Sequence, residues 1–436
     1  MRGVPDDLPT GRGTTVGWRE GTPASLAGGH DLMMPEVDQL DTGRRSPVSG
    51  RSGRYPRGMV PTLASRIEGC LVGGAVGDAL GAPFEFASWT EITRVVGEVG
   101  ITSVQAPGHF TDDTQMTLFT CQALLHANLE LEALGTCDPV VRLYDAYLAW
   151  LVTQGASFEQ VRRPDGPSSP AGWLVGVPLL HRREAPGMTC VGALESGRCG
   201  TIASPMNDSK GCGGVMRAAP AGILTIAAPP GSAPEEAYHL GCEVAAITHG
   251  HPEGIHAAGC LAAMIHVLLN GAAVSEAVEV CRPLTTPVLR SVLDHAVDVG
   301  SDGPPGPELL EEELGAGWVG EEALAIAVAC AVRAPSFTTG VLASVNHSGD
   351  TDSTGSICGN VLGALLGIDA VPVPMIDAVD GMSVVEQVAA DVTSWVTERP
   401  SAVEPNEAFG DLFNRYVAVV DRPASMGATE VDRLDR

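Results

Sequence analysis

Two runs of glycine spaced by four residues constrain this chain more than any other feature of its sequence. The runs are Gly69, Gly73, Gly77 and Gly81, and Gly355, Gly359, Gly363 and Gly367. In a helix, residues four apart lie above one another, so each run would form a stripe without side chains along one face. Each interior glycine costs about 1 kcal/mol against alanine. Close backbone packing of one helix in the groove of another is the simplest way to offset that cost.

We expect the two glycine-striped helices, residues 69–81 and 355–367, to cross in the core. The alternative is that each stripe packs on some other helix. A crossing would have a functional consequence, because one run follows a cluster of acidic residues directly and the other lies ahead of a second such cluster. The loops that carry these clusters would then approach one centre.

One acidic cluster lies in residues 347–359, HSGDTDSTGSICG. Asp350 and Asp352 stand two residues apart beside the hydroxyl of Ser353, and an apolar, glycine-rich run follows. Mg²⁺ and Mn²⁺ prefer carboxylate, hydroxyl and water oxygens as ligands, and a helix N-terminus tolerates negative charge. Taken by itself, such a pair is more often a solvated turn or a helix cap than a metal site.

A second acidic cluster strengthens the metal hypothesis. Residues 110–117 read FTDDTQMT, with Thr111, Asp112 and Asp113 at the start of a helical pattern. Together the clusters offer four carboxylates and two hydroxyls. That is enough oxygen for two divalent cations about 3.5 to 4 Å apart, provided that the fold brings the clusters together.

The remaining pattern predicts an all-α fold, a compact domain of many helices, because little of the chain alternates with period two. Helical patterns cover residues 114–135, 139–153, 174–182, 188–196, 213–224, 235–248, 253–270, 273–282, 286–299, 320–333, 384–397 and 405–420. Residues 254–275 are long enough for a membrane span, but His256, His266 and Asn270 interrupt them, so we predict a buried helix. The expected domains are a disordered leader (1–60), a catalytic domain (61–400) and a C-terminal helix and tail (401–436).

Composition narrows the function classes. The formal charge of -27 argues against binding of nucleic acid or anionic membranes through a basic face. Eleven cysteines occur without a CxxC pair, which favours reduced, buried thiols. The N-terminus lacks the apolar core of a signal peptide. We therefore expect a cytoplasmic protein.

Six blocks of the sequence resemble the ADP-ribosylglycohydrolase family, in the family's order. They are GCLVGGAVGDALGAPFEF (69–86), FTDDTQMT (110–117), SKGCGGVMRAAP (209–220), THGHP (248–252), GWVGEEALAIA (317–327) and HSGDTDSTGSICGN (347–360). The resemblance covers about residues 63–370. It implies a compact, orthogonal many-helix fold and the hydrolysis of a glycosidic bond to ADP-ribose, with two divalent cations, Mg²⁺ or alternatively Mn²⁺, as cofactors.

The resemblance also implies roles for individual residues. The expected metal ligands are Thr111, Asp112, Asp113, Asp350, Asp352 and Ser353. The expected catalytic residues are Glu85, Asp113 and Asp352, with Glu85 as acid or base. The expected substrate-binding residues, at the phosphates and distal ribose, are Ser209, Lys210, Gly211, Cys212, Gly213 and His249. Some relatives carry Tyr and Asn where Lys210 and Cys212 stand here.

Local patterns leave alternatives to several of these roles. Glu85 could be a solvated loop carboxylate. The SKGCGG loop offers small residues and free N–H groups that could cradle a diphosphate, although glycine-rich loops are common. His249 and His251 form an H-x-H pair that invites a zinc site, but Pro252 suggests a helix start there instead.

The expected reaction is the release of ADP-ribose from a modified protein side chain or another ADP-ribosyl compound, with arginine favoured over serine. Ser353, where some serine-specific relatives have threonine, is the feature that favours arginine. The alternatives are a two-metal phosphohydrolase, a non-catalytic binder of ADP-ribose, and a regulatory protein that acts through its leader or tail.

Overall fold

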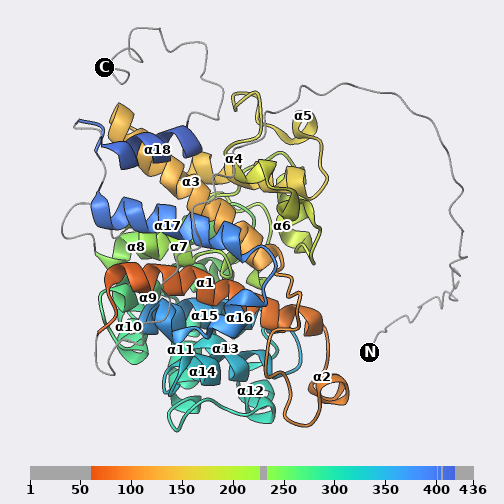
Figure 1. The fold of residues 1–436 in the computed structure, drawn as a ribbon. Coiled ribbons are helices and arrows are strands. Elements are labelled where there is room, and N and C mark those ends of the chain that lie inside the picture. The colour runs from red at the N-terminus through yellow and green to blue at the C-terminus, as the bar shows by residue number, and fades with distance from the viewer. Residues whose placement is uncertain (1–59, 226–232, 400, 404–405, 418–436) are drawn as a thin grey trace, which may run out of the picture. The chain divides into compact units, whose positions relative to one another are not determined.

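The computed structural model describes residues 60–225, 233–399, 401–403 and 406–417. The leader predicted for residues 1–60 lies almost wholly outside this range, as does the tail after residue 417. Within it the chain forms helices, short 3₁₀ turns and only isolated β-bridges, which confirms the predicted all-α fold (Figure 1). The helices are α1 (Leu63–Gly81), α2 (Trp89–Val96), α3 (Asp112–Leu134), α4 (Pro139–Thr153), α5 (Phe158–Val161), α6 (Met188–Glu195), α7 (Ala219–Leu224), α8 (Pro234–Ala246), α9 (Pro252–Leu269), α10 (Val274–Cys281), α11 (Pro287–Val299), α12 (Pro307–Leu314), α13 (Gly320–Ala331), α14 (Phe337–Val345), α15 (Thr351–Leu366), α16 (Val373–Asp377), α17 (Met382–Glu398) and α18 (Glu407–Tyr416).

The two glycine stripes pack against each other, which confirms the predicted crossing. α1 and α15 run antiparallel along their whole lengths, with Gly69 beside Gly363 and Gly73 beside Gly359. A methyl group on Gly73 would lie 2.6 Å from the Gly359 carbonyl oxygen, and one on Gly69 would lie 2.6 Å from that of Gly363. The backbones therefore touch without side chains between them, and the N-terminus of α15 meets the C-terminus of α1.

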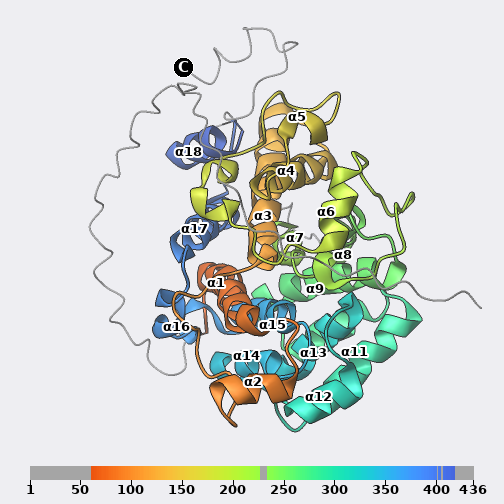
Figure 2. The same ribbon diagram turned by 90° about the vertical axis from the view of Figure 1, so that its right-hand side faces the viewer.

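The other helices surround this central pair in the part of the chain that the structure describes (Figures 1 and 2). α17 packs on α1, α13 and α14 pack on α15, and α9 contacts both α13 and α15. α3 packs against α4, α7, α17 and α18. The first turn of α3 lies near the end of α1, which places both acidic clusters beside the crossing.

α9 is the predicted buried helix. Among the described residues it is the one helix long and apolar enough to cross a membrane, and 78% of its length is buried inside the protein. Its main partners are α7, α8, α10, α13 and α15. It is thus packed as the core helix of a globular domain, as the pattern of residues 254–275 predicted.

Two predicted helices are wrong in part. Residues 174–182 form two 3₁₀ turns, Leu174–Gly176 and Pro178–His181, because Pro178 has no N–H group to continue an α-helix. In the segment 213–224, α7 begins only at Ala219, after a 3₁₀ turn at Cys212–Gly214. Neither difference changes the packing of the other helices, and residues 212–214 of the glycine-rich loop form a tight turn.

Candidate functional site

The N-terminus of α3 is held in place by Asp78, a fully buried residue of α1. The Thr111 N–H and hydroxyl donate hydrogen bonds to Asp78 Oδ1 at 2.9 and 3.0 Å. The Thr114 N–H donates to Oδ2 at 3.0 Å, and the Thr114 hydroxyl donates to the same oxygen. Asp78 therefore satisfies N–H groups that have no partner inside the first turn of a helix. It fixes the first acidic cluster to the glycine-striped helix.

The two acidic clusters come together although they lie 240 residues apart. The Ser353 hydroxyl donates a hydrogen bond to Asp113 Oδ1 at 3.3 Å. Asp350 caps α15, accepting from the Ser353 N–H at 3.3 Å, and lies close enough to Asp352 that, besides burial, that carboxylate raises the pKa of Asp350. We name the group Asp112, Asp113, Asp350 and Asp352 the acidic centre.

The segment before α6 contributes a contact that the sequence does not mark. The Gly187 N–H donates a hydrogen bond to Asp112 Oδ2 at 3.0 Å, and the Asp112 N–H donates to the Glu184 carbonyl oxygen at 3.2 Å. Residues 184–187 thereby line one side of the acidic centre. No motif in this stretch predicts it, because a backbone N–H leaves no signature in the sequence.

Two oxygens of the acidic centre fit the role of cation ligands. Asp113 Oδ2 and Asp352 Oδ1 are buried and accept no hydrogen bond, and an unpartnered buried carboxylate oxygen is costly unless a cation or water satisfies it. Across the described residues, however, no three His, Cys, Asp or Glu side chains are already gathered around one point. The ligand set is thus compatible with a metal, but its members still stand as hydrogen-bonded pairs.

Burial, followed by repulsion between the carboxyl groups, dominates the electrostatics of the acidic centre. Burial and, to a smaller extent, the charge on Asp352 raise the pKa of Asp112 to about 7. Burial and then Asp352 hold the pKa values of Asp113 and Asp350 well above the ordinary range. Burial also raises the pKa of Asp352 itself. A bound cation would relieve this repulsion, because it favours the ionised form of each neighbouring carboxyl group.

Glu85 faces the acidic centre from the end of the first striped helix. It follows the 3₁₀ turn Ala82–Phe84 and is half-buried. Burial and, to a smaller extent, the charges on Asp352, Asp112 and Asp78 together raise its pKa to about 9. These neighbours place its carboxyl group beside the centre, so it is not a solvated loop carboxylate.

The glycine-rich loop also reaches the acidic centre, but not as predicted in detail. The Cys212 thiol hydrogen-bonds to Asp350 Oδ2 at 2.7 Å. The prediction of free N–H groups is wrong at two positions, because the Gly211 N–H donates to Ser209 Oγ and the Cys212 N–H donates to the Trp318 carbonyl oxygen. The first of these contacts lies within the loop, whereas the second pairs the loop with the segment before α13 and could not be foreseen from the local sequence.

Lys210 and His249 occupy different surroundings. The Lys210 ammonium group forms an ion pair with Glu321 of α13. His249 is buried beneath the loop: a methyl group on Gly213 would lie 3.1 Å from its Cε1 atom. Burial and the nearby charge of Arg217 lower the pKa of His249 to about 3, so the ring is neutral.

The zinc alternative finds no support in the described residues. His251 is the N-cap of α9, where its Nδ1 accepts from the Glu253 N–H, as the Pro252 helix start suggested.

The fully buried Arg217 is a site residue that the sequence did not lead us to expect. Its guanidinium group lies 4.4 Å from the centroid of the Tyr147 ring and donates to Thr248 Oγ1 at 2.6 Å. The feature of the sequence that could have indicated this residue is a single arginine in the otherwise apolar block VMRAAP.

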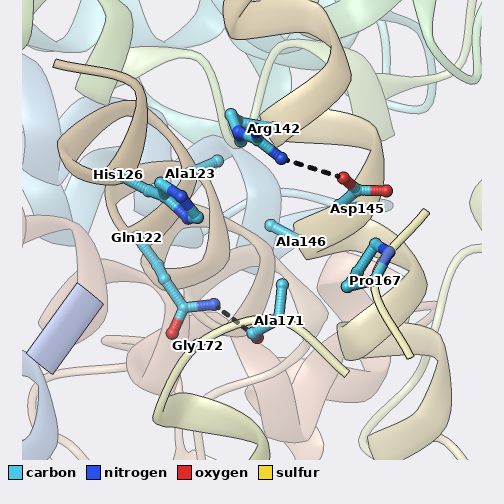
Figure 3. A pocket seen from close by; sticks show the side chains of 9 residues that line it. All are labelled: Gln122, Ala123, His126, Arg142, Asp145, Ala146, Pro167, Ala171 and Gly172. Atoms are coloured by element: carbon cyan, nitrogen blue, oxygen red, sulfur yellow. Dashed lines mark hydrogen bonds and ion pairs between the residues drawn. The ribbon is translucent and has the colours of Figure 1, made fainter. Parts of the chain in front are cut away.

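Neither of two well-defined cavities coincides with the acidic centre. One lies between α3 and α4, where Arg142 and Asp145 form an ion pair beside Gln122 and His126 (Figure 3). It holds about 10 Å³, which is room for at most one water molecule. An open groove of about 670 Å³ follows residues 376–383 and contains no predicted site residue.

Comparison with known proteins identifies the family to which the chain belongs. The family model described as ADP-ribosylglycohydrolase matches residues 59–402. The chain belongs to the ADP-ribosylglycohydrolase family. It is therefore a hydrolase of glycosidic bonds in ADP-ribose linkages, in a family that is metal-dependent.

Several relatives are similar over most of their length. The chain is 27% identical over 320 residues to the ADP-ribosyl-[dinitrogen reductase] glycohydrolase of Rhodospirillum rubrum, covering 72% of this chain and 89% of that one. It is 25% identical over 356 residues to the ADP-ribosylhydrolase ARH3 of Bos taurus, covering 71% and 87%. A solved structure titled ADP-ribosylglycohydrolase-related protein complex has a TM-score of 0.52 at 22% identity, covering 77% of this chain and 99% of that chain. This last likeness concerns the fold.

Proposed function

We propose that this protein removes ADP-ribose from a modified protein side chain, with arginine as the preferred linkage and two divalent cations as cofactors. The observation that carries the proposal is the convergence of Asp113 and Asp352, each with one buried oxygen that lacks a partner. The names of the two relatives above, which act on ADP-ribosyl groups, support the same class of substrate.

The proposed roles follow from the geometry of the acidic centre. Asp112, Asp113, Asp350 and Asp352 would hold the cations, with Thr111 and Ser353 completing the oxygen set. When bound, the cations would supply positive charge that orients the ribose hydroxyls and activates water. The carboxylates would stabilise the positive charge that develops on the sugar ring as the leaving group departs.

Glu85 is proposed as the group that exchanges a proton with the leaving group or water. Its raised pKa keeps the carboxyl group protonated at neutral pH before cations bind. A protonated carboxylic acid beside the reaction centre can protonate a departing nitrogen or oxygen. The glycine-rich loop, with Ser209, Lys210 and Gly213, and the neutral His249 would lie toward the ADP portion.

A metal-depletion assay tests the proposal. Metal-stripped protein should release no ADP-ribose from ADP-ribosyl-arginine peptides, and Mg²⁺ or Mn²⁺ should restore release, with less activity on ADP-ribosyl-serine peptides. Release of AMP instead of free ADP-ribose would indicate the phosphohydrolase alternative. Asp352→Ala tests the acidic centre directly. If Asp352 is a metal ligand, kcat should fall at least about 100-fold in this variant. Full turnover in that variant would remove the acidic centre from the mechanism.

Replacement of Glu85 separates chemistry from binding. Glu85→Gln keeps the shape of the side chain but cannot transfer a proton, so kcat should fall about 100-fold or more. The affinity for free ADP-ribose, measured by calorimetry, should stay near that of the unmodified protein. An unchanged kcat would exclude Glu85 from proton transfer.

A further inference from the structure

The segment that carries Glu85 is tied to the acidic centre from one side by its backbone. The Phe86 N–H donates to the Gly349 carbonyl oxygen at 3.2 Å, and the Gly349 N–H donates to the Ala87 carbonyl oxygen at 3.2 Å. Gly349 directly precedes Asp350, the cap of α15. Two hydrogen bonds thus link the residues after Glu85 to the residue before a proposed ligand.

Phe86 itself is in an unusual state. Its φ of 71° lies in the left-handed region that residues other than glycine rarely adopt, and its side chain is 70% exposed. A strained backbone persists only where its surroundings hold it. The ring stacks on Trp318, with centroids 5.1 Å apart and an interplanar angle of 21°, which is a favourable geometry for two aromatic rings.

Trp318 is anchored to the other parts of the site. Its carbonyl oxygen accepts from the Cys212 N–H at 3.3 Å. Two residues earlier, the Ala316 carbonyl oxygen accepts from the Asp350 N–H at 2.9 Å. The tryptophan thus sits on a short segment that contacts both the glycine-rich loop and the second acidic cluster, and it offers Phe86 a fixed ring to stack on.

We propose that the stacked rings of Phe86 and Trp318 form a latch that positions Glu85 against the acidic centre, which makes both of them positioning residues for hydrolysis. The inference rests on the proposed role of Glu85 in proton transfer. Without the stack, residue 86 is free to leave the left-handed conformation, in alanine by relief of strain and in glycine because other backbone conformations are equally accessible. That rotation carries the adjoining Glu85 carboxyl group away from Asp352. The latch acts on the rate of the chemical step and not on the binding of ADP-ribose.

Steady-state kinetics on ADP-ribosyl-arginine peptides tests the latch. Phe86→Ala and Trp318→Ala should each lower kcat about 10-fold to 100-fold, the range expected for a displaced catalytic group, while KM changes by less than about threefold. The double variant should be no slower than either single variant, because one contact is lost in all three. The conservative variants Phe86→Tyr and Trp318→Phe, which keep a stack, should restore most of kcat.

Two control variants separate the ring stack from other effects. Phe86→Gly removes the ring yet accepts a positive φ without strain, so it should lose kcat as Phe86→Ala does. Phe413→Ala removes a similar stacked pair in α18, where the Phe409 and Phe413 centroids are 5.7 Å apart, and should leave kcat unchanged. Thermal unfolding of every variant identifies any loss that comes from misfolding.

The outcomes that overturn the latch are distinct from those that overturn the proposed function. Full kcat in Phe86→Gly, or losses in the two single variants that multiply in the double variant, would show that the stack does not position Glu85. If Glu85→Gln is impaired while Phe86→Ala and Trp318→Ala are not, the latch alone is wrong. Full kcat in Glu85→Gln removes the proposed role of Glu85 and the latch with it.

Discussion

The crossing of α1 and α15 and the Glu85 segment border the same acidic centre, yet they are held in opposite ways. At the crossing, Gly69, Gly77 and Gly81 of α1 meet the backbone of α15 directly, where no side chain lies between the helices to adjust. The Glu85 segment is held by two backbone hydrogen bonds and one exposed ring stack. The α1–α15 interface therefore fixes the relative position of the two helices, whereas the position of the Glu85 segment depends on a few contacts that can be removed one at a time.

This difference assigns separate tasks to the two regions. The crossing fixes where the acidic clusters begin, because each cluster starts at or beside an end of a striped helix. In the proposed mechanism the Glu85 segment adds the group that exchanges a proton, and its few contacts allow small adjustments of position. Substitutions at the crossing should thus destabilise the whole domain, while those at the edge should change rate or local order only.

The largest effect is expected from a methyl group at the crossing. In Gly363→Ala the new methyl group would collide with the Gly69 carbonyl oxygen, and neither backbone can move without separating the helices. Overpacking of this kind costs about 3 kcal/mol or more of the free energy of unfolding. Urea denaturation measures the loss, and release of ADP-ribose should fall with it.

Gly410→Ala is the matched control for that substitution. Gly410 lies within α18, and a methyl group there meets no atom within 4 Å. Alanine should stabilise this helix by about 0.5 to 1 kcal/mol, since it restricts the unfolded chain. Equal stability of the Gly363→Ala and Gly410→Ala variants would contradict the rigid crossing.

A smaller loss is expected at Asp78, which connects the crossing to α3. Asp78→Ala leaves the buried N–H groups of Thr111 and Thr114 without their acceptor, at a cost of about 2 kcal/mol. Burial and the charge on Asp352 raise the pKa of Asp78 to about 8, so its carboxyl group is largely protonated at neutral pH and the loss is one of hydrogen bonds and not of charge. The free energy of unfolding should therefore fall by less than in Gly363→Ala.

Asp78→Asn distinguishes hydrogen bonding from charge at this position. The amide retains one acceptor oxygen, so the variant should be more stable than Asp78→Ala. Hydrogen exchange at the first turn of α3 reports the same local order. If Asp78→Ala leaves that exchange unchanged, Asp78 does not hold the helix start.

The crossing was predictable from sequence because its signal is periodic and its energetic cost demands a partner. The helix starts at Asp112 and Asp350 followed from caps and acidic residues that are local in the chain. The hydrogen bond from Gly187 to Asp112 was not predictable, because it depends on the path of a loop. The same limit applies to the Cys212 N–H group, which donates to the carbonyl oxygen of Trp318, more than 100 positions away.

The Phe86–Trp318 stack shows a further limit of sequence reasoning. Both residues lie within the blocks that resemble the family, yet nothing in their local pattern pairs a phenylalanine with a tryptophan 232 positions later. The positive φ of Phe86 is equally hidden, because the left-handed conformation is usually predicted at glycine or asparagine. Contacts between exposed side chains that are distant in the sequence can be identified only once the fold is known.

The smallest effect is expected at the outer edge, where Arg182 and Asp380 form an ion pair at 2.6 Å with side chains that are 44% and 38% exposed. Arg182 also hydrogen-bonds to His109, three residues before Asp112. Because solvent and salt screen exposed pairs, Arg182→Ala should cost less than about 1 kcal/mol, and that cost should shrink further at 1 M salt. Denaturant titrations at low and high salt measure both quantities. A salt-independent loss comparable to that of Gly363→Ala would mean that this edge is as rigid as the crossing, and the contrast between the two regions would fail.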